Sequence, residues 1–168
     1  MSKRTPGLKR NDRDFYPTPE KAVLPLVRHL AVGATYWEPC LGEGDLVRAL
    51  HKHGMVTCVG ASDTKVGAEN LTREHIDGAE LFITNPPWAA KTLHPIIRNL
   101  VPLLPTWLLL PSDWLFTRQA VEFHPWVRQI VTMPRVVWIS GTSTAGFDNC
   151  CWVYFEEGKS DFLTSGWP

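Results

Sequence analysis

Short apolar runs alternate with amphipathic stretches along most of the chain, and Gly, Pro, Asp and Asn separate them. Runs of four to seven apolar residues are typical of buried strands, whereas apolar positions three and four residues apart indicate helices. The pattern predicts helices at 19–30, 45–53, 92–100 and 113–123. It predicts strands at 34–37, 56–61, 81–84, 107–110, 127–133, 136–140 and 150–155. Residues 64–78 are polar and weakly periodic, and we expect a short helix and a vestigial strand there.

The alternation of strands and helices predicts an α/β fold with a mostly parallel sheet and right-handed crossovers. The last two predicted strands follow without a helix, so we expect an antiparallel hairpin at one edge of the sheet. Doubly wound sheets of this kind bind ligands beyond the carboxyl ends of their strands. The loops that follow the predicted strands are therefore the first place to look for functional residues.

One such loop is Asn85-Pro86-Pro87-Trp88, which follows the predicted strand at 81–84. Two prolines cannot extend a ladder of hydrogen bonds, so they mark the end of the strand. The Asn85 amide oxygen and the Pro86 carbonyl could accept both protons of a planar amine, and Trp88 offers a face on which a base can stack. The alternative is a proline turn beside a core tryptophan.

A second loop, Glu38-Pro39-Cys40-Leu41-Gly42-Glu43-Gly44, joins a predicted strand to a predicted helix. Gly42 and Gly44 tolerate positive φ and let the backbone approach a ligand closely. A carboxylate here can pair with an ammonium group, and the loop has neither the GxGxxG pattern nor the lysine of a phosphate-binding loop. An ordinary turn between a strand and a helix is the alternative.

Two further positions lie near strand and helix ends. Asp63 follows the second predicted strand, 25 residues after Glu38, where an acid can accept hydrogen bonds from ribose hydroxyls or can cap a helix. Thr18-Pro19-Glu20 indicates a helix start, with Thr18 as the N-cap and Pro19 in the first helical position.

The two loops, in this order, resemble the cofactor and catalytic motifs of the phage-type N6-adenine DNA methyltransferases. The resemblance covers about residues 15–155. It implies the class I methyltransferase fold, a doubly wound and mostly parallel seven-stranded sheet in which the first and fourth strands are neighbours. It also implies S-adenosyl-L-methionine as the cofactor and the exocyclic amine of adenine as the methyl acceptor.

The resemblance also implies roles for individual residues. Tyr16 and Thr18 would lie against the methionine moiety, and Asp77 would lie near the adenine of the cofactor, although it could also be a turn residue before Gly78. The predicted catalytic residues are Asn85, Pro86, Pro87 and Trp88. The predicted cofactor-binding residues are Tyr16, Pro17, Thr18, Glu38, Pro39, Gly42, Gly44, Asp63, Asp77 and Asn85.

The formal net charge is zero, but residues 1–14 carry a net charge of +3 and the rest of the chain −3. We expect residues 1–14 to be a basic arm that attracts phosphates, or a solubilising tail, followed by a methyltransferase domain at 15–157 and a tail at 158–168. No segment of 60 or more residues is left for target recognition. We therefore expect low sequence specificity, or a partner protein or oligomer that supplies it.

Other features narrow the classes of protein. The four cysteines form no CxxC pair, so we expect no metal site. We expect no contact with a membrane, since no run of 18 apolar residues occurs, and the N-terminus lacks the apolar segment of a secretory signal, which favours the cytoplasm.

Nucleic acid is the expected partner, and DNA is favoured over RNA. Three alternatives stay open: an RNA adenine methyltransferase, a protein glutamine methyltransferase, whose amide nitrogen presents the same chemical problem, and a non-catalytic module that binds the cofactor.

Overall fold

The computed structural model describes residues 17–62, 67–138 and 149–160. Within these ranges the strands are β1 (Thr35–Glu38), β2 (Thr57–Ala61), β3 (Leu81–Thr84), β4 (Thr106–Pro111), β5 (Val127–Thr132) and β6 (Cys150–Phe155). The α-helices are α1 (Glu20–Val27), α2 (Asp45–His53) and α3 (Ala90–Leu100). Three 3-10 helices complete the described elements: η1 (Ala68–Asn70), η2 (Ser112–Phe116) and η3 (Arg118–Trp126).

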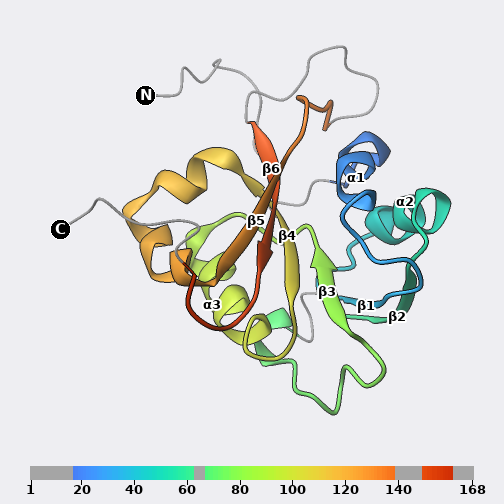
Figure 1. The fold of residues 1–168 in the computed structure, drawn as a ribbon, viewed down its shortest axis with the longest axis horizontal. Coiled ribbons are helices and arrows are strands. Elements are labelled where there is room, and N and C mark those ends of the chain that lie inside the picture. The colour runs from blue at the N-terminus through green and yellow to red at the C-terminus, as the bar shows by residue number, and fades with distance from the viewer. Residues whose placement is uncertain (1–16, 63–66, 139–148, 161–168) are drawn as a thin grey trace.

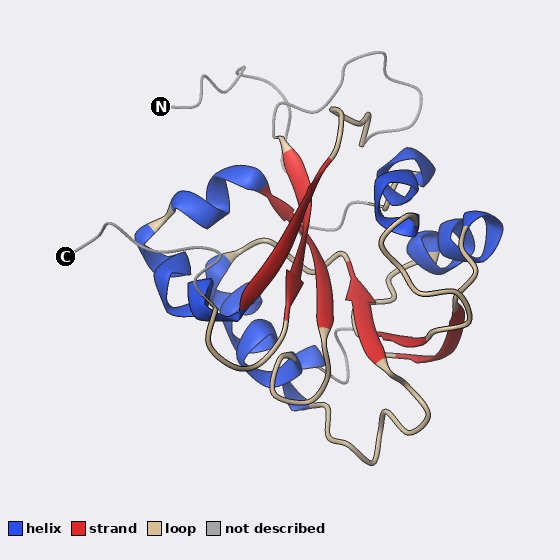
Figure 2. Ribbon diagram, viewed as in Figure 1, coloured by secondary structure: helices blue, strands red, loops and turns tan. Residues whose placement is uncertain are grey.

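The strands form one sheet in the order β2-β1-β3-β4-β6-β5. Neighbours from β2 to β4 are parallel, and β6 is antiparallel to both β4 and β5. Helices α1 and α2 lie on one side of the sheet, and α3, η2 and η3 lie on the other (Figures 1 and 2). The helices that follow β1 and β3 therefore cover opposite faces, and the switch point of the doubly wound sheet lies between these two strands.

The α/β architecture and the antiparallel edge pair are confirmed, but the described residues contain six strands instead of seven. Residues 67–80 form η1 and turns in place of the vestigial strand. Their apolar side chains, which include Leu71 and Ile76, are buried against the α3 side of the sheet. The Asn99 side chain also donates hydrogen bonds of 2.9 and 3.1 Å to the carbonyls of Ala68 and Leu71. This segment thus covers the core and does not extend the sheet.

The strand predicted at 136–140 is absent from residues 136–138, and its remainder lies outside the described residues. The reason is that β6 already has a partner on each side, because it pairs with β4 and with β5 along its length. The edge hairpin is therefore made by β5 and β6. Val136 is instead buried in the cluster beneath α1.

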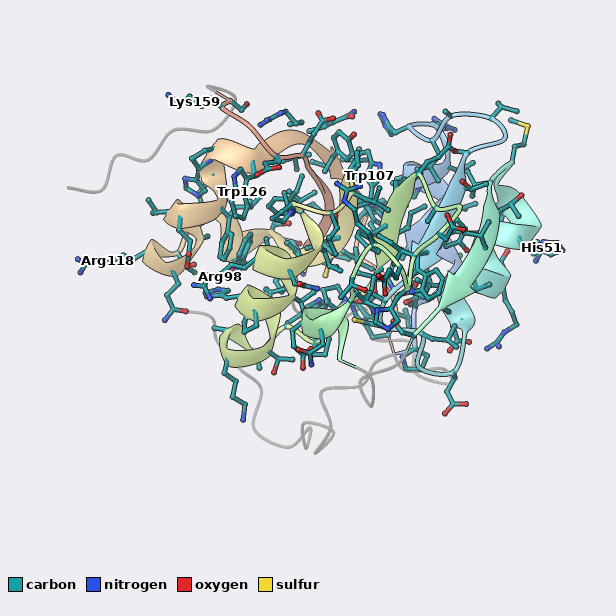
Figure 3. The ribbon with its side chains drawn as sticks, turned by 90° about the horizontal axis from the view of Figure 1, so that it is seen from below. His51, Arg98, Trp107, Arg118, Trp126 and Lys159 are labelled. Carbon is teal, nitrogen blue, oxygen red and sulfur yellow. The ribbon has the colours of Figure 1, made fainter. Side chains whose placement is uncertain are left out.

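Strand β4 shows how the sheet divides the core. Trp107 and Leu109 pack into the cluster under α1 and α2, whereas Leu108 and Leu110 pack into the cluster under α3. This alternation is the period of two that a strand buried on both faces requires. Trp107 lies among densely packed side chains, while Arg118 and Lys159 point outward from the body (Figure 3).

The first helix is tied to the last strand. The buried indole N–H of Trp152, in β6, donates a 2.8 Å hydrogen bond to the Ala22 carbonyl in α1. Ala22, Val23 and Leu26 are fully buried in the same cluster as Trp152. None of the helices in the described ranges is long and apolar enough to span a membrane.

Candidate functional site

The two loops singled out by the sequence leave the sheet side by side. Strands β1 and β3 are parallel neighbours, with Tyr36 opposite Leu81 and Trp37 opposite Phe82. Glu38 ends β1, Thr84 ends β3 and Asn85 follows directly. The carboxyl ends of the two strands at the switch point therefore carry the two predicted motifs, as the sequence led us to expect.

Glu38 is a buried carboxyl group with one unsatisfied oxygen. Its side chain is 1% exposed, and Oε1 accepts a 3.0 Å hydrogen bond from the Cys40 backbone N–H. Glu38 Oε2 and the neighbouring Thr84 Oγ1 make no hydrogen bond of ordinary geometry with the described residues. Burial raises the pKa of Glu38 to about 8, an effect that the nearby Thr84 hydroxyl and the Cys40 N–H only partly offset. A cationic group next to Oε2 would satisfy it and restore its charge.

The loop after Glu38 is held in place by the end of β2. The Ser62 carbonyl accepts a 2.9 Å hydrogen bond from the Leu41 N–H, and the Ser62 N–H donates a 2.9 Å bond to the Glu38 carbonyl. The Ser62 hydroxyl donates to the Pro39 carbonyl at 3.3 Å. Ser62 was not among the residues predicted for the site, although it lies directly before Asp63 in the chain.

The predicted glycines adopt the conformation expected of them. Gly42 has φ of 51° and Gly44 has φ of 77°, both in the left-handed region that favours glycine. Gly44 is also the N-cap residue of α2, which begins at Asp45. The loop thus turns sharply from Glu38 into the helix, and its backbone lies at the carboxyl edge of the sheet.

Asn85 is bonded to the segment that precedes α1. Its Nδ2 donates a 3.2 Å hydrogen bond to Thr18 Oγ1. The predicted N-cap role of Thr18 is wrong, because α1 has Pro19 at its N-cap position and receives no side-chain cap. Pro19 is extended, with ψ of 140°, so the Thr18 side chain is turned away from the helix end and is available to Asn85.

Trp88 is half-buried and anchored at its polar edge. Its indole N–H donates a 2.9 Å hydrogen bond to the Leu109 carbonyl of β4. Trp138 meets it edge to face, with the ring centroids 5.3 Å apart and an interplanar angle of 89°. The sequence does not indicate this contact, because Trp138 lies in the segment at 136–140 whose pattern predicts a strand. The orientation of the Trp88 ring is therefore fixed from two sides.

Four of the other predicted site residues are prolines next to residues already described, and two lie outside the described residues. Pro86 is buried and Pro87 half-buried beside Asn85, Pro39 is buried beside Glu38, and the exposed Pro17 precedes Thr18. Tyr16 and Asp63 lie outside the described residues.

Asp77 lies elsewhere. It is exposed, and nearby Glu80 donates its N–H to the carbonyl of Thr35, the first residue of β1. Residues 77–80 are thus at the amino ends of the strands, because the chain must return there to begin the parallel strand β3. The structure does not bring Asp77 together with Glu38 and Asn85.

No protein-family model matches this sequence, and no curated protein matches it. Solved structures do match. One is a protein named as a modification subunit of a type I restriction enzyme from Vibrio vulnificus, with a TM-score of 0.55 and 14% identity over 86% of this chain and 45% of that one. Another is a protein named as an RNA methyltransferase from Pyrococcus horikoshii, with a TM-score of 0.54 and 14% identity over 83% and 85%.

A third match is the methyltransferase subunit of a type I restriction-modification system from Streptococcus thermophilus, with a TM-score of 0.50 and 12% identity over 86% of this chain and 45% of that one. The chain therefore spans less than half the length of either restriction subunit. At such identities the likeness concerns the fold. The fold of this chain is that of the class I methyltransferases, with six described strands.

Proposed function

We propose that this protein is an S-adenosylmethionine-dependent methyltransferase that methylates the exocyclic amine of adenine in nucleic acid, with DNA favoured over RNA. One observation carries the proposal. A buried carboxyl group with an unsatisfied oxygen, Glu38, ends the strand next to the one that leads into Asn85-Pro86-Pro87-Trp88. The residues that we propose for a cationic cofactor and those that we propose for a planar amine thus lie at adjacent strand ends of the sheet.

The residues present fit the amino-acid end of S-adenosylmethionine. Glu38 Oε2 is buried without a partner among the described residues, so an ammonium group would supply its missing counter-charge. Gly42 and Gly44 bring backbone close to the same edge. We assign Tyr16 and Pro17 to the methionine moiety and Asp63 to the ribose on the resemblance. We leave out Asp77, and also Thr18, whose hydroxyl oxygen accepts a hydrogen bond from Asn85. The bound cofactor would supply an electrophilic methyl group on a sulfonium.

The chain's own residues would prepare the acceptor. The lone pair of an adenine amine is conjugated with the ring, so the amine is a poor nucleophile. Acceptance of its two protons by the Asn85 amide oxygen and the Pro86 carbonyl would favour a pyramidal nitrogen with a free lone pair. Pro86 and Pro87 keep the carbonyl rigid, so the contribution is one of position and preorganised electrostatics.

The anchored ring of Trp88 provides a flat face for the acceptor base. A base that is methylated on its exocyclic amine must leave the stack, and it is then held by stacking and by contacts to its edge. The hydrogen bond to Leu109 and the contact with Trp138 keep the indole in one orientation. We infer that Trp88 stacks with the extruded base while Asn85 and Pro86 engage its amine.

We further propose that this domain by itself reads little sequence. Base-edge recognition requires an element that enters a groove and places several side chains there. The segments between the assigned motifs, 64–78, 111–126 and 141–149, are each shorter than about twenty residues. A partner subunit would then supply the specificity. The fold is also shared with proteins named as subunits of restriction systems, which supports a nucleic-acid substrate.

The test is methyl transfer from a tritium-labelled cofactor to DNA, RNA and protein offered separately, followed by digestion and chromatography. We expect label in N6-methyladenine, and the ratio of DNA to RNA product decides between the two substrates. Asn85→Ala is the matched control. It should abolish turnover while the affinity for S-adenosylhomocysteine stays near normal. Label only in protein, or only in methylcytosine, would refute the adenine assignment.

A further inference from the structure

We propose that Thr18 is a positioning residue for Asn85. Its hydroxyl oxygen holds the side-chain nitrogen of Asn85, and this bond directs the amide oxygen toward the acceptor amine. The inference rests on the proposed function and adds a residue role to it. It differs from the role that the resemblance gives to Thr18, which is contact with the methionine moiety of the cofactor.

The geometry connects two segments that are far apart in the sequence. Asn85 Nδ2 lies 3.2 Å from Thr18 Oγ1, across 67 positions of the chain, and Thr18 is 8% exposed. The terminal torsion of an asparagine is broad and roughly two-fold, so an unrestrained amide samples many orientations. Because the amide is planar, a fixed nitrogen also fixes the direction of the oxygen. A hydrogen bond from the Asn85 amide N–H to a buried hydroxyl oxygen therefore selects one orientation out of a broad set.

The hydroxyl is not needed by the helix that follows it. The first turn of α1 is closed by backbone, with the Ala22 N–H donating a 2.8 Å bond to the Pro19 carbonyl, and no side chain caps the helix. Removal of the Thr18 hydroxyl should therefore leave α1 intact. This separates its effect on Asn85 from an effect on folding.

The anchor itself is rigid. Pro19 fixes the backbone directly after Thr18, and α1 is held to the sheet by the hydrogen bond from Trp152 to the Ala22 carbonyl at 2.8 Å. Ala22 and Val23 are fully buried. The hydroxyl of Thr18 is thus placed by the core of the protein and can serve as a fixed reference point for the Asn85 amide.

The first experiment compares Thr18→Val, which keeps the shape without the hydroxyl, with Thr18→Ser, which keeps the hydroxyl. We expect Thr18→Val to lower kcat for methyl transfer by about 10- to 100-fold, as expected for a misplaced catalytic group. The Kd for S-adenosylhomocysteine should change by less than about threefold, and Thr18→Ser should restore most of kcat. An unchanged kcat in Thr18→Val, or a loss of cofactor affinity as large as the loss of kcat, would overturn the proposal.

The second experiment does not need activity. The chain has five asparagines, so side-chain amide signals of protein labelled with ¹⁵N-asparagine are few, and Asn85→Ala assigns one pair. We expect Thr18→Val to shift that pair and to speed its hydrogen exchange, with the other pairs unmoved and Thr18→Ser close to wild type. An unmoved Asn85 pair refutes the bond. If wild-type protein transfers no methyl group to nucleic acid, the proposed function is refuted. The experiment would then still detect the hydrogen bond between Thr18 and Asn85, but the bond would have no catalytic role.

Discussion

At the scale of single residues, Glu38 is a buried carboxyl group whose charged form is disfavoured by its surroundings. Its carboxyl group is buried, and its pKa is raised to about 8 chiefly by burial. In the unfolded chain the same group titrates near 4.5. Below that pH both states bind the proton and Glu38 has no pH-dependent effect. Between the two values only the unfolded state loses its proton, so stability falls as pH rises, and the deficit is complete above about pH 8.

Replacement of Glu38 by Gln should therefore stabilise the protein at alkaline pH. We expect Glu38→Gln to raise the free energy of unfolding at pH 8 by roughly 2–5 kcal/mol relative to wild type, with little difference near pH 4.5. Urea unfolding at the two pH values measures this. The same variant should bind S-adenosylhomocysteine more weakly. A variant that is less stable than wild type at pH 8 would show that Glu38 has a structural partner.

Binding of the cofactor should also release a proton. At pH 7 free Glu38 is largely protonated, because its pKa is about 8, and an ammonium partner favours the charged carboxylate. We expect affinity for S-adenosylhomocysteine to rise with pH from 6 to 8. Calorimetry at pH 7 in buffers of different ionisation enthalpy should show close to one proton released per ligand in wild type and none in Glu38→Gln. Equal heats in all buffers for wild type would argue against this pairing.

At the scale of elements, the loop after Glu38, residues 39–44, depends on how Trp37 lies across β2. Trp37 is paired with Gly60, and a Cβ built on Gly60 would overlap the Trp37 ring. The Trp37 indole N–H also reaches Ser62 Oγ at 3.4 Å, and Ser62 holds the loop after Glu38. Glycine at position 60 therefore lets the ring lie flat over the strand that positions the loop.

A methyl group at position 60 should disturb both stability and binding. We expect Gly60→Ala to cost about 1–3 kcal/mol through overpacking and to weaken S-adenosylhomocysteine binding, because Trp37 must move and Ser62 with it. Val59→Ala, at the neighbouring and 40% exposed position, is the control and should leave binding unchanged. Thermal melts and calorimetry report the two effects. Binding unaffected in a destabilised Gly60→Ala would uncouple Trp37 from the loop.

Some elements could be predicted to the residue and others could not. The strands at Leu81–Thr84 and Cys150–Phe155 and the helix at Asp45–His53 were predicted with their observed bounds. Glycines at 44 and 54 flank the helix, Asn85-Pro86 follows the first strand, and polar pairs at 148–149 and 156–157 bound the second. The helix predicted at 113–123 forms two 3-10 helices instead. The chain is extended at Thr117, with ψ of 148°, which lets Trp114 and Phe123 stack in the core. Tertiary packing of the two rings overrides the local pattern there.

The same contrast applies to the candidate site. That Glu38 and Asn85 share one edge follows from a parallel sheet with its switch point between their strands, so sequence reasoning could reach it. The bond between Thr18 and Asn85 spans 67 positions and depends on the backbone at Pro19, and no local pattern indicates it. Asp77 lies at the amino ends of the strands because the chain must return there before the parallel strand β3 begins, and spacing along the sequence does not show this.

At the scale of the whole molecule, the net charge of residues 1–14 is opposite in sign to that of the rest of the chain. Residues 1–14 carry five basic and two acidic side chains, whereas the chain as a whole is neutral. In the body several cations are already paired on the surface, as in Arg98 with Glu122 at 2.7 Å and Arg48 with Asp45 at 2.7 Å. We therefore propose that the arm supplies much of the attraction for a polyanionic substrate.

Neutralisation of the arm tests this. We expect replacement of Lys3, Arg4, Lys9, Arg10 and Arg13 by Gln to weaken binding to duplex DNA and to flatten the dependence of log Kd on log salt by about 3–4 units. Cofactor affinity should be unchanged. Fluorescence anisotropy at several salt concentrations measures the slope, and an unchanged slope would exclude the arm from the interface. Long-read mapping of methylated adenines should show many sequence contexts.

The tie between the first helix and the last strand has a consequence for the order in which the protein is made. Glu38 and Asn85 leave the ribosome early, but the surface on which α1 rests includes Trp152, near the end of the described chain. Until Trp152 has been synthesised and β6 pairs with both β4 and β5, α1 lacks part of the surface against which it packs. Thr18 is then not held beside Asn85. A chain that ends before Trp152 would carry both motifs without the surface that holds α1, so we expect the proposed activity to require the chain through β6.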